Sequence, residues 1–95
     1  MAAYVFAEIE VTDPAPYEEY RKQVLAVVTK YGGKFIVRGG RIEPREGGWK
    51  PQRMVALEFP SMEQALKWYD SPEYAPLIRL RQKASKGKLI IVEGA

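Results

Sequence analysis

The sequence of 95 residues contains neither cysteine nor histidine. Without cysteine there can be no disulfide bond, no thiolate nucleophile and no thiolate metal site. Without histidine there can be no histidine-ligated haem, no typical zinc site and no Ser-His-Asp triad within the chain. Any proton transfer must use Asp, Glu, Lys, Tyr or bound water. We therefore expect neither a metal nor a cofactor.

Long apolar runs are missing as well. No apolar stretch approaches the roughly 20 residues that span a bilayer. The first residues lack both the basic start and the apolar run of a signal peptide. The expectation is a cytoplasmic protein without a membrane partner.

Charge of one sign is scarce. The net charge is +3, but basic and acidic residues are mixed along most of the chain. One sign prevails only near the end of the last predicted helix, where the helix dipole favours cations. The residues concerned are Arg79, Arg81, Lys83, Lys86 and Lys88. This distribution does not indicate a nucleic-acid partner.

What the sequence does contain is regular alternation of apolar and polar residues. It predicts strands at residues 4–11, 34–43, 53–59 and 88–93. Asp13-Pro14 predicts the N-cap and first turn of a helix, and Gly32-Gly33 predicts its end. The paired glycines inside the second strand suit an edge strand with a bulge.

Two further helices are predicted between the third and fourth strands. Ser61 and Gln64 fit a capping box that begins the first of them. Ser71-Pro72 ends that helix, and Pro76 predicts a loose first turn for the next one. In the last helix Leu77, Leu80 and Ala84 are expected to pack on the core.

This order of elements predicts a single α+β domain over residues 1–95. Two crossovers joined by a hairpin give a ferredoxin-like βαββαβ antiparallel sheet with helices on one face. The first and third strands should be central. The other face of the sheet would carry Tyr4, Phe6, Met54 and Ala56, more apolar surface than a monomer usually exposes. We expect a second copy to cover it, as a homodimer joined sheet to sheet.

Several segments together resemble a known family. They are Val11-Thr-Asp-Pro14 with Tyr17 and Tyr20, Tyr31-Gly-Gly-Lys-Phe35, Arg38-Gly-Gly40, Glu58-Phe-Pro-Ser61, Trp68-Tyr-Asp-Ser-Pro-Glu-Tyr74, Leu80-Arg81 and Val92-Glu-Gly94. The chain resembles a bacterial domain-of-unknown-function family of small dimeric α+β barrel proteins, similar in fold to the antibiotic-biosynthesis monooxygenases. The resemblance implies a ferredoxin-like homodimer whose two sheets form a barrel. Relatives on this fold include cofactor-free oxygenases, isomerases, decarboxylases and haem-handling enzymes, and fold alone does not choose among them.

Glu8 and Glu58 are the candidate acid–base pair, because both are predicted on the uncovered face of neighbouring strands. Two carboxylates in a partly apolar cleft can be pushed apart in pKa, which leaves one of them as a general base. Glu58 is the preferred catalytic residue. The alternative is that each carboxylate is held in an ion pair, with Arg38, Arg41 or Arg53 available.

Arg38 and Gly39 are candidate substrate-binding residues. The arginine would grip a carboxylate or phosphate while the glycine lets the ligand approach the backbone. The alternative is an edge bulge with a solvated arginine.

Aromatic residues around Asp70 form the other candidate binding site. Trp68, Tyr69 and Tyr74 could line a pocket, although packing in the core is the more common use of such residues. Arg81 could close the same pocket or pair with Asp70 or Glu73. Trp49 lies in a turn and is expected at a dimer contact.

Three functions are open at this stage. The first is a homodimeric protein that binds a small anionic or aromatic ligand in a cleft and acts as a cofactor-independent enzyme of oxygenase or isomerase type. There Glu58 would be the base and Arg38 the anion clamp. The second is a non-catalytic binding or assembly module. The third, RNA binding, is disfavoured because the third strand presents Met54, Ala56 and Glu58 rather than stacking aromatics.

Overall fold

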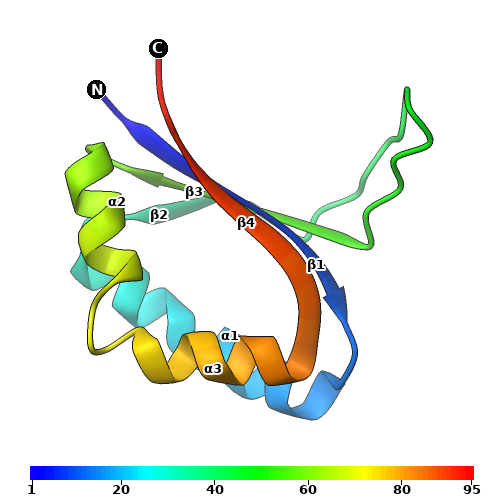
Figure 1. Cartoon of the computed structure of the whole chain (residues 1–95), viewed down its shortest axis with the longest axis horizontal. Helices are drawn as coiled ribbons and strands as arrows, with labels where there is room; N and C mark the ends of the chain where they lie inside the picture. Colours follow the sequence, from blue (N-terminus) through cyan, green and yellow to red (C-terminus); the bar gives the residue numbers. More distant parts are fainter.

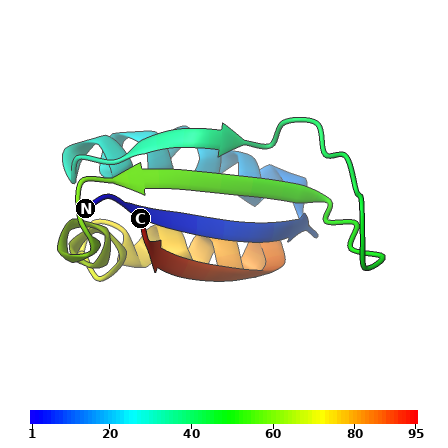
Figure 2. The ribbon, with the colours of Figure 1, turned by 90° about the horizontal axis from the view of Figure 1, so that it is seen from above.

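The chain forms four strands and three helices in a computed structural model that describes all residues, 1–95. In chain order the elements are β1 (Ala3–Val11), α1 (Pro14–Lys30), β2 (Lys34–Arg38), β3 (Arg53–Phe59), α2 (Met62–Tyr69), α3 (Ala75–Ala84) and β4 (Ser85–Glu93). The strands pair antiparallel in the order β2-β3-β1-β4. All three helices lie on one side of the sheet (Figure 1), and Figure 2 looks onto the other side, with the helices behind the strands.

The predicted ferredoxin-like α+β fold is confirmed, with β1 and β3 in the centre and β2 and β4 at the edges. β1 shows why the pattern is informative. Its residues Ala3, Val5, Ala7 and Ile9 are all buried, and the residues between them are more exposed. Since successive side chains of a strand point to opposite faces, the alternation directs one apolar row of β1 toward the helices.

Helix α1 carries the apolar stripe that the helical spacing of its tyrosines and valines predicts. Tyr17, Tyr20, Val24 and Val28 are buried, at spacings of three or four residues. Gly32 ends the helix with a φ of 84°, the left-handed conformation that glycine adopts without steric cost. Asp13 occupies the N-cap position, but its side chain accepts no capping hydrogen bond.

The capping box of α2 is present in its first half. Ser61 accepts a hydrogen bond at 3.1 Å from the backbone N–H of Gln64. Trp68 is the large buried side chain of this helix, whereas Leu66 is exposed. Helical spacing predicts a buried stripe of Met62, Ala65, Leu66 and Tyr69 here, and the structure departs from it at Leu66, because an eight-residue helix gives too few repeats to fix its phase.

Strand β2 differs from the prediction in length and in register. It ends at Arg38 instead of residue 43, because Gly39 takes a φ of 72° and leaves the strand. The register with β3 shifts between Phe35 and Val37, so the bulge lies at Ile36 and not at the paired glycines. The bulge changes which face the following side chains occupy. Strand β4, in turn, begins at Ser85 rather than at residue 88, because Ser85 already pairs with Val11.

The uncovered side of the sheet is apolar at its centre. We call it the open face; its residues are Tyr4, Phe6, Glu8, Glu10, Lys34, Val37, Met54, Ala56, Glu58, Lys86, Lys88, Ile90 and Val92. Phe6 is 39% exposed and Ile90 is 59% exposed. No element of the chain lies over them (Figure 2). None of the three helices combines the length and the apolar composition needed to span a membrane.

Candidate functional site

A small cavity lies between the sheet and the helices. It measures about 30 Å³ and is lined by eleven residues: Val5, Ala7, Ile9, Tyr17, Tyr20, Val55, Leu57, Trp68, Tyr74, Arg81 and Leu89. We call it the interior cavity. The strands supply its aliphatic wall, and the helices with the turn before α3 supply its aromatic and polar groups. A space of this size holds one or two water-sized groups.

Two tyrosine hydroxyls meet among the residues that line this cavity. The Oη atoms of Tyr20 and Tyr74 are 2.7 Å apart and buried. The ring of Tyr74 stacks on Trp68 with 4.3 Å between the centroids. Burial raises the pKa of both phenols, so both are protonated at neutral pH. The Arg81 guanidinium acts against burial and pulls the pKa of Tyr74 back down.

Arg81 is the one charged side chain of the cavity, and it is 8% exposed. Its Nε is buried and has no hydrogen-bond partner among the protein's own atoms. None of the ion pairs includes it. Asp70 is exposed, and Glu73 is bound to Lys30 and to the hydroxyl of Tyr31. The expected pairing of Arg81 with Asp70 or Glu73 is therefore absent.

Helix α3 places Arg81 in the cavity because it shares the buried stripe with Leu77 and Ala84. These three positions are four and three residues apart, the spacing of one helix face. Leu77, Leu80 and Ala84 pack on the core as expected, Leu80 with partial burial, but the burial of Arg81 was not expected from the sequence. An arginine four residues after an apolar stripe position was the signal for a buried charge.

The structure brings the aromatic candidates Trp68, Tyr69 and Tyr74 together, but Trp68 and Tyr74 are buried in the core instead of lining the mouth of a pocket. Trp68 and Tyr74 are each 1% exposed. Tyr69 meets the rings of both edge-on, at 5.9 Å from each centroid. Tyr17 and Tyr20 recur at helical spacing with the apolar residues of α1, and this spacing by itself predicts packing rather than a site. Their phenols lie on a buried stripe, where a hydroxyl needs a partner, and this signal could have marked them as site residues.

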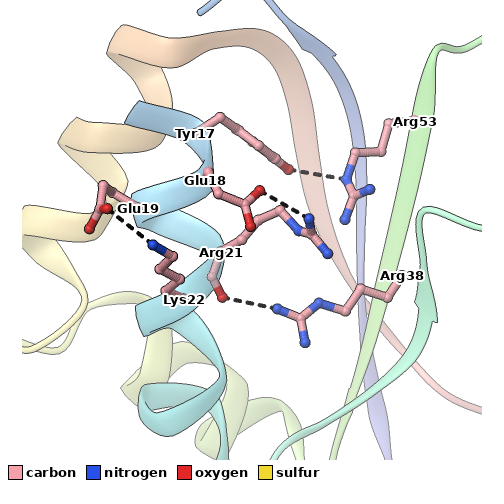
Figure 3. Close-up of polar contacts among 7 residues, drawn as sticks. All are labelled: Tyr17, Glu18, Glu19, Arg21, Lys22, Arg38 and Arg53. Atoms are coloured by element: carbon pink, nitrogen blue, oxygen red, sulfur yellow. Dashed lines mark hydrogen bonds and ion pairs between the residues drawn. The ribbon is translucent and has the colours of Figure 1, made fainter. Parts of the chain in front are cut away.

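Arg38 and Gly39 do not line the interior cavity. Arg38 donates a hydrogen bond at 3.1 Å to the backbone carbonyl of Arg21, and its guanidinium lies 4.2 Å from the centroid of the Phe35 ring. Figure 3 shows Arg38 reaching from β2 toward α1. A Cβ at Gly39 would collide with the guanidinium of Arg53. The missing side chain of Gly39 therefore makes room for Arg53 of the same chain, and not for a ligand.

Three guanidinium groups gather at this margin of the sheet, which we call the arginine edge (Arg21, Arg38 and Arg53). Arg53 donates from Nε to the hydroxyl of Tyr17 at 3.2 Å, which links the edge to the interior cavity (Figure 3). Glu18 is the one carboxylate paired here, with Arg21 at 3.1 Å. The β2 side of the cavity is consequently electropositive.

Glu58 lies on the open face, away from the interior cavity. It pairs with Lys34 at 3.1 Å and accepts a hydrogen bond from the Tyr4 hydroxyl at 3.1 Å. Lys34 first, and then Tyr4, holds the pKa of this carboxyl below its usual value, so Glu58 is ionised and occupied. Arg38 is on the opposite face, since the bulge at Ile36 reverses the alternation of β2. Within one chain the predicted combination of Glu58 as base and Arg38 as anion clamp does not form.

The predicted pairing of Glu8 with Glu58 is also absent. Glu58 lies opposite Tyr4 on β1, and Glu8 lies opposite Met54 on β3. The two carboxylates are thus four residues apart along the strands, roughly 13 Å. At that distance across an exposed surface they cannot share a proton.

A shallow hollow of about 280 Å³ lies on the open face. Its lining consists of Phe6, Glu8, Trp49, Met54, Lys88, Leu89 and Ile90. Trp49 belongs to the loop between β2 and β3, is 58% exposed, and closes one side of this hollow. Its place beside the open face agrees with the use expected for it, a contact between two copies of the chain.

The family model that matches the chain is DUF1330, a domain of unknown function, and the match spans residues 2–95. The chain belongs to this family. The resemblance found in the Trp68–Tyr74 run and its companion segments is thereby confirmed. No curated protein matches this DUF1330 chain.

Solved structures share the fold over nearly the whole chain. A dabb family protein with a ferredoxin-like fold from Mesorhizobium loti has a TM-score of 0.72 at 12% identity, covering 99% of this chain and 97% of that one. SnoaB, a cofactor-independent oxygenase from Streptomyces nogalater, has a TM-score of 0.64 at 12% identity, with 99% and 92% covered. A dimeric ferredoxin-like protein of unknown function from Thermobifida fusca has a TM-score of 0.58 at 12% identity, with 99% and 92% covered. Identities this low establish the fold alone.

Proposed function

We propose that this DUF1330 protein is a homodimer that binds a small molecule in the interior cavity of each subunit. The observation that carries the proposal is the meeting of Tyr20, Tyr74 and Arg81 in a cavity whose other walls are apolar. Small-molecule sites combine a mostly apolar lining with a few polar groups that fix the ligand's orientation. Burying hydroxyls and a cation in an otherwise apolar core costs free energy, and a bound ligand would compensate for this cost.

The open face supports the homodimer. Phe6, Val37, Ile90 and Val92 are exposed on one side of a four-stranded sheet. Pairing two open faces would bury this surface, and stable interfaces bury about 800 Å² on each partner. The Thermobifida fusca relative in fold is described as dimeric. In such a dimer the Trp49 loop of each chain would border the partner's sheet.

The cavity suits cofactor-independent chemistry, the class named for SnoaB. The Tyr20–Tyr74 hydroxyl pair would transfer a proton to or from a substrate oxygen. Arg81 would stabilise negative charge that develops on that oxygen. Glu58 has no part in this site, because it lies on the other face of the sheet.

A second candidate is a non-catalytic binding or assembly module. The size of the cavity favours it, since about 30 Å³ is far below the roughly 300 Å³ or more of pockets for drug-sized ligands. An enzyme acting on a larger substrate would have to open this space, whereas a module could leave it closed.

A metabolite screen by thermal shift tests the proposal, using the wild type, Tyr74→Phe and Arg38→Ala. Each ligand-induced change in Tm is measured against the same variant without ligand. We expect a hit whose shift falls in Tyr74→Phe and persists in Arg38→Ala. Ligands that raise the Tm of Tyr74→Phe and of the wild type equally would exclude the interior cavity as the binding site. A shift lost only in Arg38→Ala would place the site at the arginine edge, as the sequence predicted.

A further inference from the structure

We infer that the interior cavity binds the carboxylate of a small organic acid, held by Arg81, by the free hydroxyl proton of the Tyr20–Tyr74 pair and by the hydroxyl proton of Tyr17. The inference rests on the proposed function, because it gives the ligand class of the same cavity. It goes further in stating the charge and the size of the group that enters.

The first argument is the charge of Arg81. A guanidinium stays protonated in a protein, so burial does not neutralise it. Buried charges are normally paired, because an uncompensated one carries the full loss of hydration. Arg81 is 8% exposed, its Nε has no partner, and no carboxylate lies within ion-pair distance. An anion in the cavity would supply the missing partner.

The second argument is the sign of the surroundings. No acidic residue is among the eleven that line the cavity. On its far side Arg53 donates to the Tyr17 hydroxyl, and Arg38 lies beyond it on β2. Cations thus approach the cavity from both α3 and the sheet, and a cationic ligand would meet repulsion from each.

The third argument is the supply of donors. The Tyr20–Tyr74 pair holds two hydroxyl protons and uses one of them in its mutual hydrogen bond. Tyr17 accepts from Arg53 and keeps its own proton. Together with the Arg81 Nε–H, these groups offer donors to a ligand that only accepts, as a carboxylate does.

The fourth argument is volume. About 30 Å³ admits a group no larger than one or two waters. A planar carboxylate meets this limit, whereas a phosphate or an aromatic ring does not fit without movement of the helices. The compact group also suits the fork of an arginine, which matches carboxylate geometry.

The test compares formate with formamide, a neutral molecule of nearly the same shape. The protein carries Trp49→Phe, so that Trp68, which lines the cavity, is the only tryptophan that emits. Each compound is titrated at constant ionic strength, and both Trp68 fluorescence and Tm are recorded. We expect saturable changes with formate and none with formamide. Sodium chloride forms a third arm, in which an equal response would assign the site to inorganic anions and overturn the carboxylate.

Variants of α3 locate the effect. Arg81→Met removes the charge and should weaken formate binding at least about tenfold, the loss expected for one charge-assisted hydrogen bond. Arg79→Met, an exposed position on the same helix, should leave binding unchanged. Arg81→Lys retains a cation and should bind more weakly than the wild type but better than Arg81→Met. Should Arg81→Met not fold, this lysine variant and the comparison of formate with formamide decide the matter.

The outcomes separate the inference from the proposed function. Saturable responses of equal size to formate and formamide would contradict the inference that the ligand is an anion, but would still support a cavity that binds small molecules. Formate binding that is as tight in Arg81→Met as in the wild type would show that the anion binds at a site without Arg81. No response of Trp68 to any of the compounds would overturn both the inference and the cavity as a site.

Discussion

The two faces of the sheet use aromatic residues in different ways. On the helix-covered face Tyr20 and Tyr74 bury their hydroxyls against each other, beside Arg81, whose Nε has no hydrogen-bond partner and which no carboxylate pairs. On the open face Tyr4 donates to a carboxylate that Lys34 also neutralises, and Phe6 is partly exposed. On the covered face the side chains are buried and the charge of Arg81 is not paired with a carboxylate. On the open face the carboxylate is paired, but the apolar side chains are exposed. The first arrangement supports the proposed small ligand, and the second supports the proposed homodimer.

The largest expected effect separates the packing of the two faces. Phe59→Ala removes a side chain that is 0% exposed and should lower the free energy of unfolding by about 3–5 kcal/mol. Phe6→Ala should destabilise less, by an amount that depends on protein concentration, because in the proposed homodimer the surface that covers Phe6 belongs to a second chain. Urea denaturation at several protein concentrations measures both. An unfolding midpoint of the wild type that is independent of concentration would break this distinction.

The next effect concerns association. Phe6→Lys places a charge at the centre of the open face and should raise the dimer dissociation constant at least about 100-fold, as for a central contact residue. Leu25→Lys, at a position of α1 that is also exposed, is the matched control and should leave the dimer intact. Sedimentation at micromolar concentration gives the mass of each. A wild type with the mass of one chain contradicts the prediction.

A smaller effect compares hydroxyls on the two faces. Tyr20→Phe leaves the buried Tyr74 hydroxyl without its partner and should cost about 1–3 kcal/mol of unfolding free energy. Tyr4→Phe on the open face should cost less, since water replaces the lost bond. The double variant Tyr20→Phe with Tyr74→Phe should be less destabilised than the sum of the two single variants. Additive losses would show that the two hydroxyls do not interact.

The smallest effect is a dependence on pH at the junction of α1 and α3. Lys30 first, and then Tyr31, lowers the pKa of Glu73 to about 2 from a usual 4.5. A lowered pKa favours the folded state above about pH 4.5, and this contribution is lost as the pH falls toward 2. The stability difference between the wild type and Glu73→Gln should therefore shrink across that range. Glu63→Gln, at an exposed position of α2, serves as the control. A stability difference between the wild type and Glu73→Gln that stays constant down to pH 2 would contradict the lowered pKa of Glu73.

The sequence predicted those parts of the fold that depend on regular alternation. β1 and β3 are continuous, so their faces, their central position and the apolar open face follow from a period of two residues. The stripe of α1 follows from seventeen residues of helical spacing. A family signature in the Trp68–Tyr74 run gave the assignment to a family of unknown function.

The errors have local causes. The end of β2 depends on Gly39 adopting a left-handed conformation, and the bulge at Ile36 depends on hydrogen bonds with β3 that no single-strand pattern encodes. The same register places Arg38 on the helix-covered side of the sheet, away from Glu58, which lies on the open face as predicted. Whether Arg81 finds a carboxylate depends on contacts between distant segments. Its place on the stripe of Leu77 could be predicted, but its lack of a partner could not.

The bulge at Ile36 makes the number of residues in β2 matter as much as their identity. Lys34 and Arg38 lie on opposite sides of the sheet although they are four positions apart, because one residue between them is not counted in the pairing with β3. Without the bulge, Ile36 would pair with Ala56, the side chains of β2 would alternate strictly, and Arg38 would lie opposite Met54 on the open face. One unpaired residue thus keeps this positive charge on the helix-covered side, and deleting Ile36 would leave it there, because Phe35, Val37 and Arg38 would still alternate against the same partners on β3.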